Sequence, residues 1–186
     1  TLYNTKLNAV LHPYAAEINA PRASKEPWEI EYMKKAQEIT DRTFDDLLNV
    51  IHPGMTEKEL CAELIYRLYK YGSEGPSSDP ITVSGPNTSR PHGVPAERVL
   101  QYGDFVTMDC GCLYHGYCSD MTRTYFWMKA VTTYTAIHDL GREANEKAEK
   151  LIRPGVRFCD IDAEARNHIS ATGYGEYFTH RLSHFI

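Results

Sequence analysis

The sequence of 186 residues has no apolar stretch long enough to span a membrane and no signal-peptide pattern. It also lacks a basic run, and its formal net charge is −5, which disfavours nucleic-acid binding as the main activity. The five cysteines are odd in number and show no disulfide-rich pattern, which favours a reducing compartment. We therefore expect a cytoplasmic protein that binds neither nucleic acid nor membrane.

An initiator methionine is missing as well, because the first residue is Thr1. The chain is thus expected to be processed or to be part of a longer one. Residues 1–20 mix short apolar runs with proline and show no strong period, which predicts a strand remnant and connector. The remaining composition, 42% hydrophobic and 24% charged, is ordinary for a globular protein of one domain or slightly more.

The most informative stretch is residues 104–126, which is rich in β-branched and aromatic residues and predicts two strands joined by a tight turn. If Tyr114 and His115 form that turn, Asp109 lies directly opposite Asp120. Like charges at that spacing are destabilising, so the pair needs a hard divalent cation, two such cations, or a proton. Two alternatives stay open: a longer loop with a shifted register, or two solvated aspartates on an exposed sheet face.

Two helices are predicted before this hairpin. Ser24 is a capping residue for the first helix, which is apolar at helical spacing and ends before Gly54. Thr56 and Glu59 form a capping box for the second helix, and Gly72 is its C-terminal glycine.

Residues 72–98 are rich in glycine, proline and serine and predict loops, interrupted by a short strand at 80–84. After the hairpin, residues 136–152 predict a third helix with one apolar face. Asp160 is the expected cap of a fourth helix, which ends at Gly173.

The helix ends reveal an internal repeat. Ile51-His52-Pro53-Gly54 is matched 101 residues later by Ile152-Arg153-Pro154-Gly155, and a further glycine follows each at the same spacing, Gly72 and Gly173. This pattern predicts a duplicated unit of helix, helix and strands. The second copy of the hairpin would fall beyond the last residue, so what the second half supplies to the site is expected to be mostly missing.

Near the end of the chain, His180 and His184 lie four residues apart. Imidazole is a common metal ligand and the usual general acid or base near neutral pH. Residues four apart share a face in a strand or a helix, so both side chains can point into one cleft. The alternative is a pair of ordinary surface histidines.

Four motifs follow one another along the chain: Arg90-Pro91-His92-Gly93-Val94-Pro95, Gly103-Asp104-x-Val106-x-Met108-Asp109-x-Gly111, Gly116-Tyr117-x-Ser119-Asp120-Met121-Thr122-Arg123-Thr124 and His180-x-Leu182-Ser183-His184. In this order they resemble the pita-bread metallopeptidases, and most closely their Xaa-Pro branch, prolidase (Xaa-Pro dipeptidase) and aminopeptidase P. The likeness begins at about Arg22 and runs to the C-terminus.

The resemblance implies an α+β class with a duplicated pita-bread (creatinase/aminopeptidase) fold. A curved antiparallel sheet would be backed by helices, and the second half would be truncated. Residues 21–186 would form the metallopeptidase catalytic domain, incomplete at its C-terminus, and residues 1–20 a connector or the remnant of an N-terminal domain. Since such N-terminal domains support dimers in the family, a homodimer is the implied assembly.

The resemblance also implies a two-metal centre. Asp109 would bind one ion, Asp120 would bridge both ions and His184 would bind one of them. His180 would stabilise or protonate the reacting group, and His92 would line the substrate side of the cleft. Two further glutamates complete the centre in the family and have no counterpart in this sequence.

The implied function is hydrolysis of the Xaa-Pro bond in dipeptides or at peptide N-termini, with a metal-activated water as nucleophile. Family likeness favours Mn²⁺, while carboxylate and imidazole ligands also suit Co²⁺ or Zn²⁺. Two alternatives remain: a non-catalytic peptide- or protein-binding domain on the same fold, or an inactive fragment. With two expected ligands absent, we expect the isolated 186-residue chain to have little or no activity.

Overall fold

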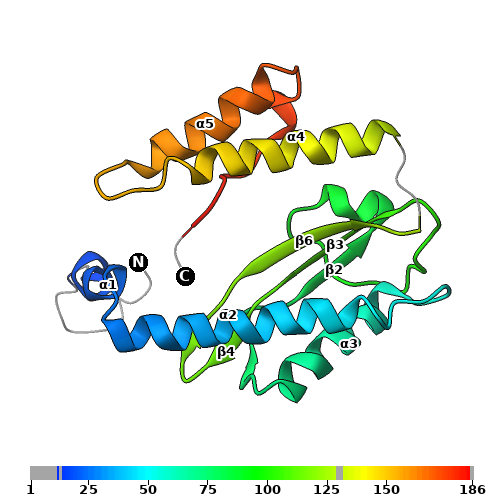
Figure 1. Ribbon diagram of the computed structural model, residues 1–186, viewed down its shortest axis with the longest axis horizontal. Helices are drawn as coiled ribbons and strands as arrows, with labels where there is room; N and C mark the ends of the chain where they lie inside the picture. Colours follow the sequence, from blue (N-terminus) through cyan, green and yellow to red (C-terminus); the bar gives the residue numbers. More distant parts are fainter. Residues whose placement is uncertain (1–11, 13, 129–131, 185–186) are drawn as a thin grey trace, which may run out of the picture.

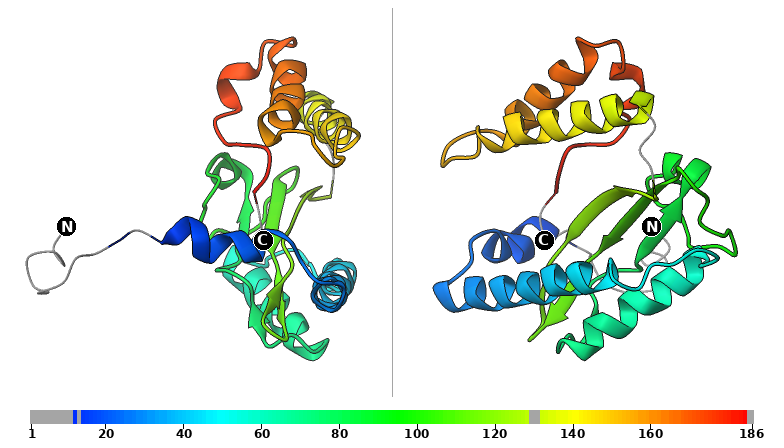
Figure 2. Two further views of the ribbon diagram at one scale, coloured as in Figure 1. Left: turned by 90° about the vertical axis from the view of Figure 1, so that its left-hand side faces the viewer. Right: turned by 45° about the vertical axis from the view of Figure 1, so that its right-hand side comes forward.

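The computed structural model describes residues 12, 14–128 and 132–184. Within these ranges the α-helices α1 to α3 precede the antiparallel strands, and α4 and α5 follow them. The strands lie between the pair α2 and α3 and the pair α4 and α5 (Figures 1 and 2). The helices are α1 (Ala15–Ala23), α2 (Pro27–Leu47), α3 (Glu57–Lys70), α4 (Thr132–Glu149), α5 (Phe158–Ser170) and the short 3₁₀ turns η1 (Gly85–Ser89) and η2 (Gly175–Tyr177). The strands are β1 (Gly75–Pro76), β2 (Ile81–Ser84), β3 (Phe105–Cys110), β4 (Cys112–Tyr114), β5 (Tyr117–Cys118) and β6 (Met121–Phe126).

The strands form two three-stranded antiparallel sheets, with the orders β1-β4-β5 and β2-β3-β6. One hairpin, β3-β4 against β5-β6, runs through both sheets and confirms the two strands predicted over residues 104–126. The short strand predicted at 80–84 is confirmed as β2, which pairs with β3.

The predicted register of this hairpin is wrong by one residue in the turn. Tyr114 pairs with Tyr117, so His115 and Gly116 form the turn, with φ of 49° and 80°. A two-residue turn that matches strand twist needs positive φ at both positions, and glycine takes one of them without strain. Consequently Asp109 lies opposite Thr122 and not opposite Asp120.

The first helix pair packs on the sheets and forms the larger hydrophobic core. The capping box at the start of α3 is confirmed: the Thr56 hydroxyl accepts the Glu59 N–H, and the Glu59 carboxylate accepts the Thr56 N–H. The core is built from apolar side chains of α2, α3, the hairpin and the adjoining loops, namely Ala36, Ile39, Phe44, Leu47, Met55, Leu60, Leu64, Leu68, Leu100, Val106, Met108, Cys110, Cys112 and Met121.

The second helix pair has a smaller core of its own around Ala144, Ala148 and Ala165. The repeat predicted from the glycines is visible here, because α3 begins at Glu57 and α5 begins 101 residues later at Phe158. Rings of Phe105 and Tyr134, 5.2 Å apart between centroids, connect the sheet to α4. The fold is therefore a helix pair and hairpin followed by a second helix pair.

Two predicted helix starts and the interpretation of the N-terminal residues need correction. Ser24 does not cap α2, because the N-cap residue is Glu26, directly before Pro27, which forms a capping box with Glu29 in the first turn. Asp160 does not cap α5; it lies in the first turn, where it binds the Arg157 guanidinium through two hydrogen bonds. Residues 15–23 form a helix where a strand remnant was expected, since the alanines there favour helix.

Gly111 lies where β3 gives way to β4, and it is the tightest point of the hairpin. A Cβ atom there would lie 1.7 Å from the Ser119 carbonyl oxygen and 2.3 Å from the Ser77 Oγ. By contrast, Gly141 in α4 has open space around the same position.

We expect Gly111→Ala to lower the free energy of unfolding by about 3 kcal/mol, because the backbone of two strands must separate to admit the methyl group. Gly141→Ala is the matched control and is expected to raise stability by about 1 kcal/mol, since alanine favours the helix interior. Urea denaturation of both variants measures the difference, and equal stabilities would contradict the packing described.

Candidate metal centre and cleft

The strand β3 presents Asp109 on the face away from the main core. Burial alternates along β3, with Met108 and Cys110 fully buried beneath the sheet. Since successive side chains of a strand point to opposite faces, Asp109 points outward between these two residues. Asp120 lies in the turn between β5 and β6, close enough for its charge to act on Asp109.

The two carboxylates repel each other. Partial burial raises the pKa of Asp109 above its ordinary value, and the negative charge of Asp120 raises it further. A hydrogen bond with Thr122 and the charges of the nearby His184 and His92 act against this shift and lower the pKa. Net destabilisation of the charged form follows from burial and from the neighbouring carboxylate, which is the electrostatic situation that a bound cation relieves.

The C-terminal segment brings His184 to Asp120. After η2 this segment runs from the second helix pair back toward the sheet (Figure 1). The Nε2 atom of His184 lies 3.3 Å from Oδ2 of Asp120. Both side chains are partly open to solvent, with 50% and 37% exposed. A residue near the end of the chain, beyond η2, thus contacts the hairpin.

The same segment brings His180 to His92. Their rings meet edge to face, with 5.9 Å between centroids, and Nδ1 of His180 lies 2.8 Å from the Arg181 carbonyl oxygen. Residues 179–184 form neither strand nor helix, so the shared face expected from regular spacing does not apply. Instead His180 meets His92 while His184 meets Asp120.

An ion pair on α5 holds this segment in place. The Arg166 guanidinium binds the Asp162 carboxylate and donates to the carbonyl oxygens of Phe178 and His180, at 2.8 and 3.2 Å. Asp162 in turn accepts the Leu182 N–H at 2.9 Å. The backbone on both sides of His180 is therefore fixed to one helix.

These side chains border one cleft of about 730 Å³. His180 flanks it through its contact with His92. The lining residues are Ser77, Ser78, Asp79, Pro80, Ile81, His92, Gly93, Val94, Pro95, Asp109, Cys118, Ser119, Asp120 and His184.

The donor set in the cleft fits a divalent metal ion in its chemistry. Carboxylate oxygen and imidazole nitrogen are ligands for Mn²⁺, Co²⁺ and Zn²⁺, and the mutual repulsion of Asp109 and Asp120 favours a cation between them. Within residues 12–184, apart from those not described, no three candidate ligands are grouped closely enough to hold an ion by themselves. The cleft thus provides part of a coordination sphere.

Comparison with known proteins places this arrangement in a family. The sequence profile of metallopeptidase family M24 matches residues 31–186. The chain belongs to this family. Its fold is accordingly the duplicated pita-bread fold of the α+β class, as the order of motifs implied.

Solved structures of M24 members are closely similar. The Xaa-Pro dipeptidase from Bacillus anthracis superimposes with a TM-score of 0.90 at 36% identity, covering 96% of this chain and 50% of that one. The X-Pro aminopeptidase from Thermotoga maritima has a TM-score of 0.84 at 38% identity, covering 86% of this chain and 46% of that one.

Among curated M24 relatives, an uncharacterized peptidase of Staphylococcus saprophyticus is 38% identical over 167 residues. The match covers 90% of this chain and 48% of the relative. The chain therefore spans about half the length of the curated relatives it matches. Within the part that the structure describes, the helices are too short or too polar to cross a bilayer.

Sequence reasoning missed the residues that hold the histidine segment. Asp162 and Arg166 have the four-residue spacing of a helical ion pair, which was visible in the sequence. Their partners, the carbonyl oxygens of residues 178 and 180, belong to irregular backbone and leave no sequence pattern. Asp79, which also lines the cleft, was noticed only as part of a loop.

We expect Asp120→Asn to lower the pKa of Asp109, because the substitution removes the carboxylate charge that raises it. Carbon-detected NMR titration of the aspartate side chains in the presence of EDTA measures this pKa. Asp79→Asn is the control, because Asp79 also lines the cleft but is not one of the main causes of the Asp109 pKa shift. An unchanged Asp109 pKa in Asp120→Asn would show that the two carboxylates are not coupled.

Proposed function

We propose that the complete protein hydrolyses the peptide bond before proline, in dipeptides or at peptide N-termini. The observation that carries this proposal is that Asp109, Asp120 and His184 line one cleft in a member of family M24. The two aspartates come from one hairpin, and His184 comes from a segment much later in the sequence. Similarity to an Xaa-Pro dipeptidase and an X-Pro aminopeptidase supports proline as the residue after the cleaved bond.

Asp109, Asp120 and His184 are the residues that would hold the metal, and we propose two Mn²⁺ ions per complete site. Ions there would polarise the substrate carbonyl as Lewis acids and lower the pKa of water. The carboxylates of Asp109 and Asp120 contribute the negative charge that keeps a cation in the cleft. His184, whose Nε2 lies 3.3 Å from Oδ2 of Asp120, would contribute an imidazole nitrogen as a ligand.

His92 and His180 are the proposed substrate-contacting and proton-handling residues. Their edge-to-face contact keeps the two imidazoles beside each other, and His92 lines the cleft. The hydrogen bond of the His180 Nδ1 to the Arg181 carbonyl oxygen assigns a proton to that nitrogen. Its Nε2 is then the atom left to accept or return a proton at the substrate.

Other expectations accompany this function. Residues 21–186 as the catalytic domain, residues 1–20 as a connector or domain remnant, a homodimer and a cytoplasmic location stay predictions.

We expect Asp109→Asn and Asp120→Asn each to abolish hydrolysis of an Ala-Pro dipeptide by the complete protein and to remove bound metal. Elemental analysis after Mn²⁺ loading is expected to give about two ions per parent chain, as in two-metal hydrolases, and fewer in both variants. The exposed Asp41→Asn, on α2 outside the residues lining the cleft, is the control and keeps activity and metal.

The result separates the proposal from its alternatives. Peptide binding without metal or turnover in the complete protein would favour a non-catalytic binding domain. The isolated 186-residue chain, measured alongside, is expected to turn over little or no dipeptide. Full activity of Asp109→Asn and Asp120→Asn would overturn the proposal.

A further inference from the structure

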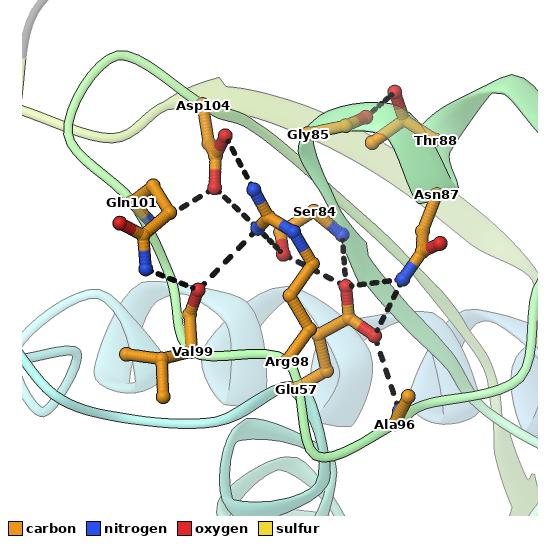
Figure 3. A network of polar contacts seen from close by, with 10 residues as sticks. All are labelled: Glu57, Ser84, Gly85, Asn87, Thr88, Ala96, Arg98, Val99, Gln101 and Asp104. Atoms are coloured by element: carbon orange, nitrogen blue, oxygen red, sulfur yellow. Dashed lines mark hydrogen bonds and ion pairs between the residues drawn. The ribbon is translucent and has the colours of Figure 1, made fainter.

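Glu57, the first residue of α3, has a fully buried carboxylate. Figure 3 shows both of its oxygens surrounded by donors. One oxygen accepts the Ser84 N–H and the Ser84 hydroxyl, each at 2.7 Å. The Asn87 amide donates to both oxygens, at 3.1 and 3.2 Å, and the Ala96 N–H donates to the second at 3.1 Å.

All of these donors are uncharged. Burying a carboxylate is costly, and a set of hydrogen bonds of this kind offsets the cost without adding much net stability. Apolar side chains of similar volume often stabilise a fold as well as a buried charged network does. The particular property of the Glu57 network is therefore the geometry that it imposes on its donors.

The donors lie on both sides of His92. Ser84 and Asn87 precede it and Ala96 follows it, so one carboxylate fixes both ends of the loop. The backbone of α3 adds two more contacts to the same loop. The Glu57 N–H donates to the Arg98 carbonyl oxygen, and the Lys58 N–H donates to that of Ala96.

Backbone turns extend this placement toward His92. The Arg90 N–H donates to the Asn87 carbonyl oxygen, and the Gly93 N–H donates to the Arg90 carbonyl oxygen. Gly93 itself is buried against Val83, where an added Cβ would lie 2.8 Å from the valine Cγ1. The residue next to His92 thus has no room to shift toward β2.

The network also reaches the strand that carries Asp109. Ser84 donates its hydroxyl hydrogen to Glu57 and accepts from the Arg98 guanidinium at 2.5 Å. Arg98 pairs through two nitrogens with Asp104, the residue directly before β3 (Figure 3). Hydrogen bonding to Asp104 raises the pKa of Arg98, which keeps this link charged.

We propose that Glu57 is a positioning residue for the cleft, because it holds His92 against His180 and in register with β3. Glu57 does not line the cleft and acts through the loop it binds. The inference rests on the proposed function for its effect on catalysis, whereas its effect on the placement of His92 is independent of that function.

Glu57→Gln tests the placement directly. The amide keeps the volume of the carboxylate but turns one acceptor into a donor, which opposes the Ala96 N–H or the Ser84 N–H. In the complete protein with ¹³C-labelled histidine, we expect the ring resonance of His92 to shift or broaden at fixed pH. His92→Ala assigns that resonance by removing it.

Activity provides a second readout through a double-mutant cycle with His92→Ala. We expect Glu57→Gln to lower kcat/KM for Ala-Pro by about tenfold to a hundredfold, as misplaced groups do. On the His92→Ala background the same change is expected to cost less than about threefold, since its target is gone. A purely structural role would give equal losses on both backgrounds.

Asp46→Asn is the matched control, because Asp46 is a hydrogen-bonded carboxylate that binds side chains on α3 and at its end, outside the loop that carries His92. It accepts from the Tyr71 hydroxyl at 2.6 Å and pairs with Arg67 and Lys70. We expect this variant to leave the His92 resonance unchanged and any activity loss to be additive with His92→Ala.

If Glu57→Gln does not fold, Asn87→Ala replaces it, since that change removes a single donor from the loop side. An unshifted His92 resonance in the folded variant, or equal losses in the cycle, would overturn the proposal. A parent protein that hydrolyses no Xaa-Pro peptide would overturn the proposed function instead, and the resonance would still decide the role of Glu57.

Discussion

The cleft depends on the register of a single hairpin. β3 carries Asp109, and Asp120 follows β5 on the returning arm, so the separation of the two carboxylates is set by backbone pairing and not by side-chain choice. That pairing is fixed at one end by the positive-φ turn at His115 and Gly116. At the other end Gly111 allows the backbone of Ser119 to approach more closely than any side chain permits. Tight backbone packing thus keeps two like charges together in the cleft.

The imidazoles that lie beside this hairpin come from two different segments, and each segment is held by polar contacts to a helix. His92 is carried by a loop whose two ends bind the buried Glu57. His180 and His184 are carried by irregular backbone that Asp162 and Arg166 fix to α5. These irregular stretches of backbone are therefore fixed by the carboxylates of Glu57 and Asp162, which are not among the residues that line the cleft.

Local sequence chemistry was sufficient where one element determined the outcome. The capping box of Thr56 and Glu59 and the short strand at 80–84 were predicted from adjacent residues, and the repeat was predicted from glycines at matched spacing. The M24 family was suggested by the resemblance of four motifs taken together in their order along the chain. Asp109, Asp120, His184 and His92 were also named from sequence as residues of one site, and the structure brings all four to one cleft.

The errors arose where a neighbouring group competed. Ser24 is a good capping residue, but Glu26 lies closer to the helix-favouring Pro27 and takes that position. Asp160 likewise does not occupy the N-cap position of α5, because its carboxylate binds the Arg157 guanidinium from the first turn. The turn was misplaced by one residue because the sequence does not show which backbone positions take positive φ. The burial of Glu57 was not predictable, since it depends on donors at both ends of a loop that lies far from Glu57 in the sequence.

The two hydrophobic cores have a consequence for the motions of the protein. One core joins α2, α3 and the hairpin, and the other joins α4 and α5. Separate cores favour separate cooperative units in native-state opening. Asp109, Asp120 and His92 belong to the first unit, while His180 and His184 are attached to the second. Opening of the smaller unit would therefore separate the candidate ligands while the sheet stays folded, and a cation held by both units would couple their stabilities.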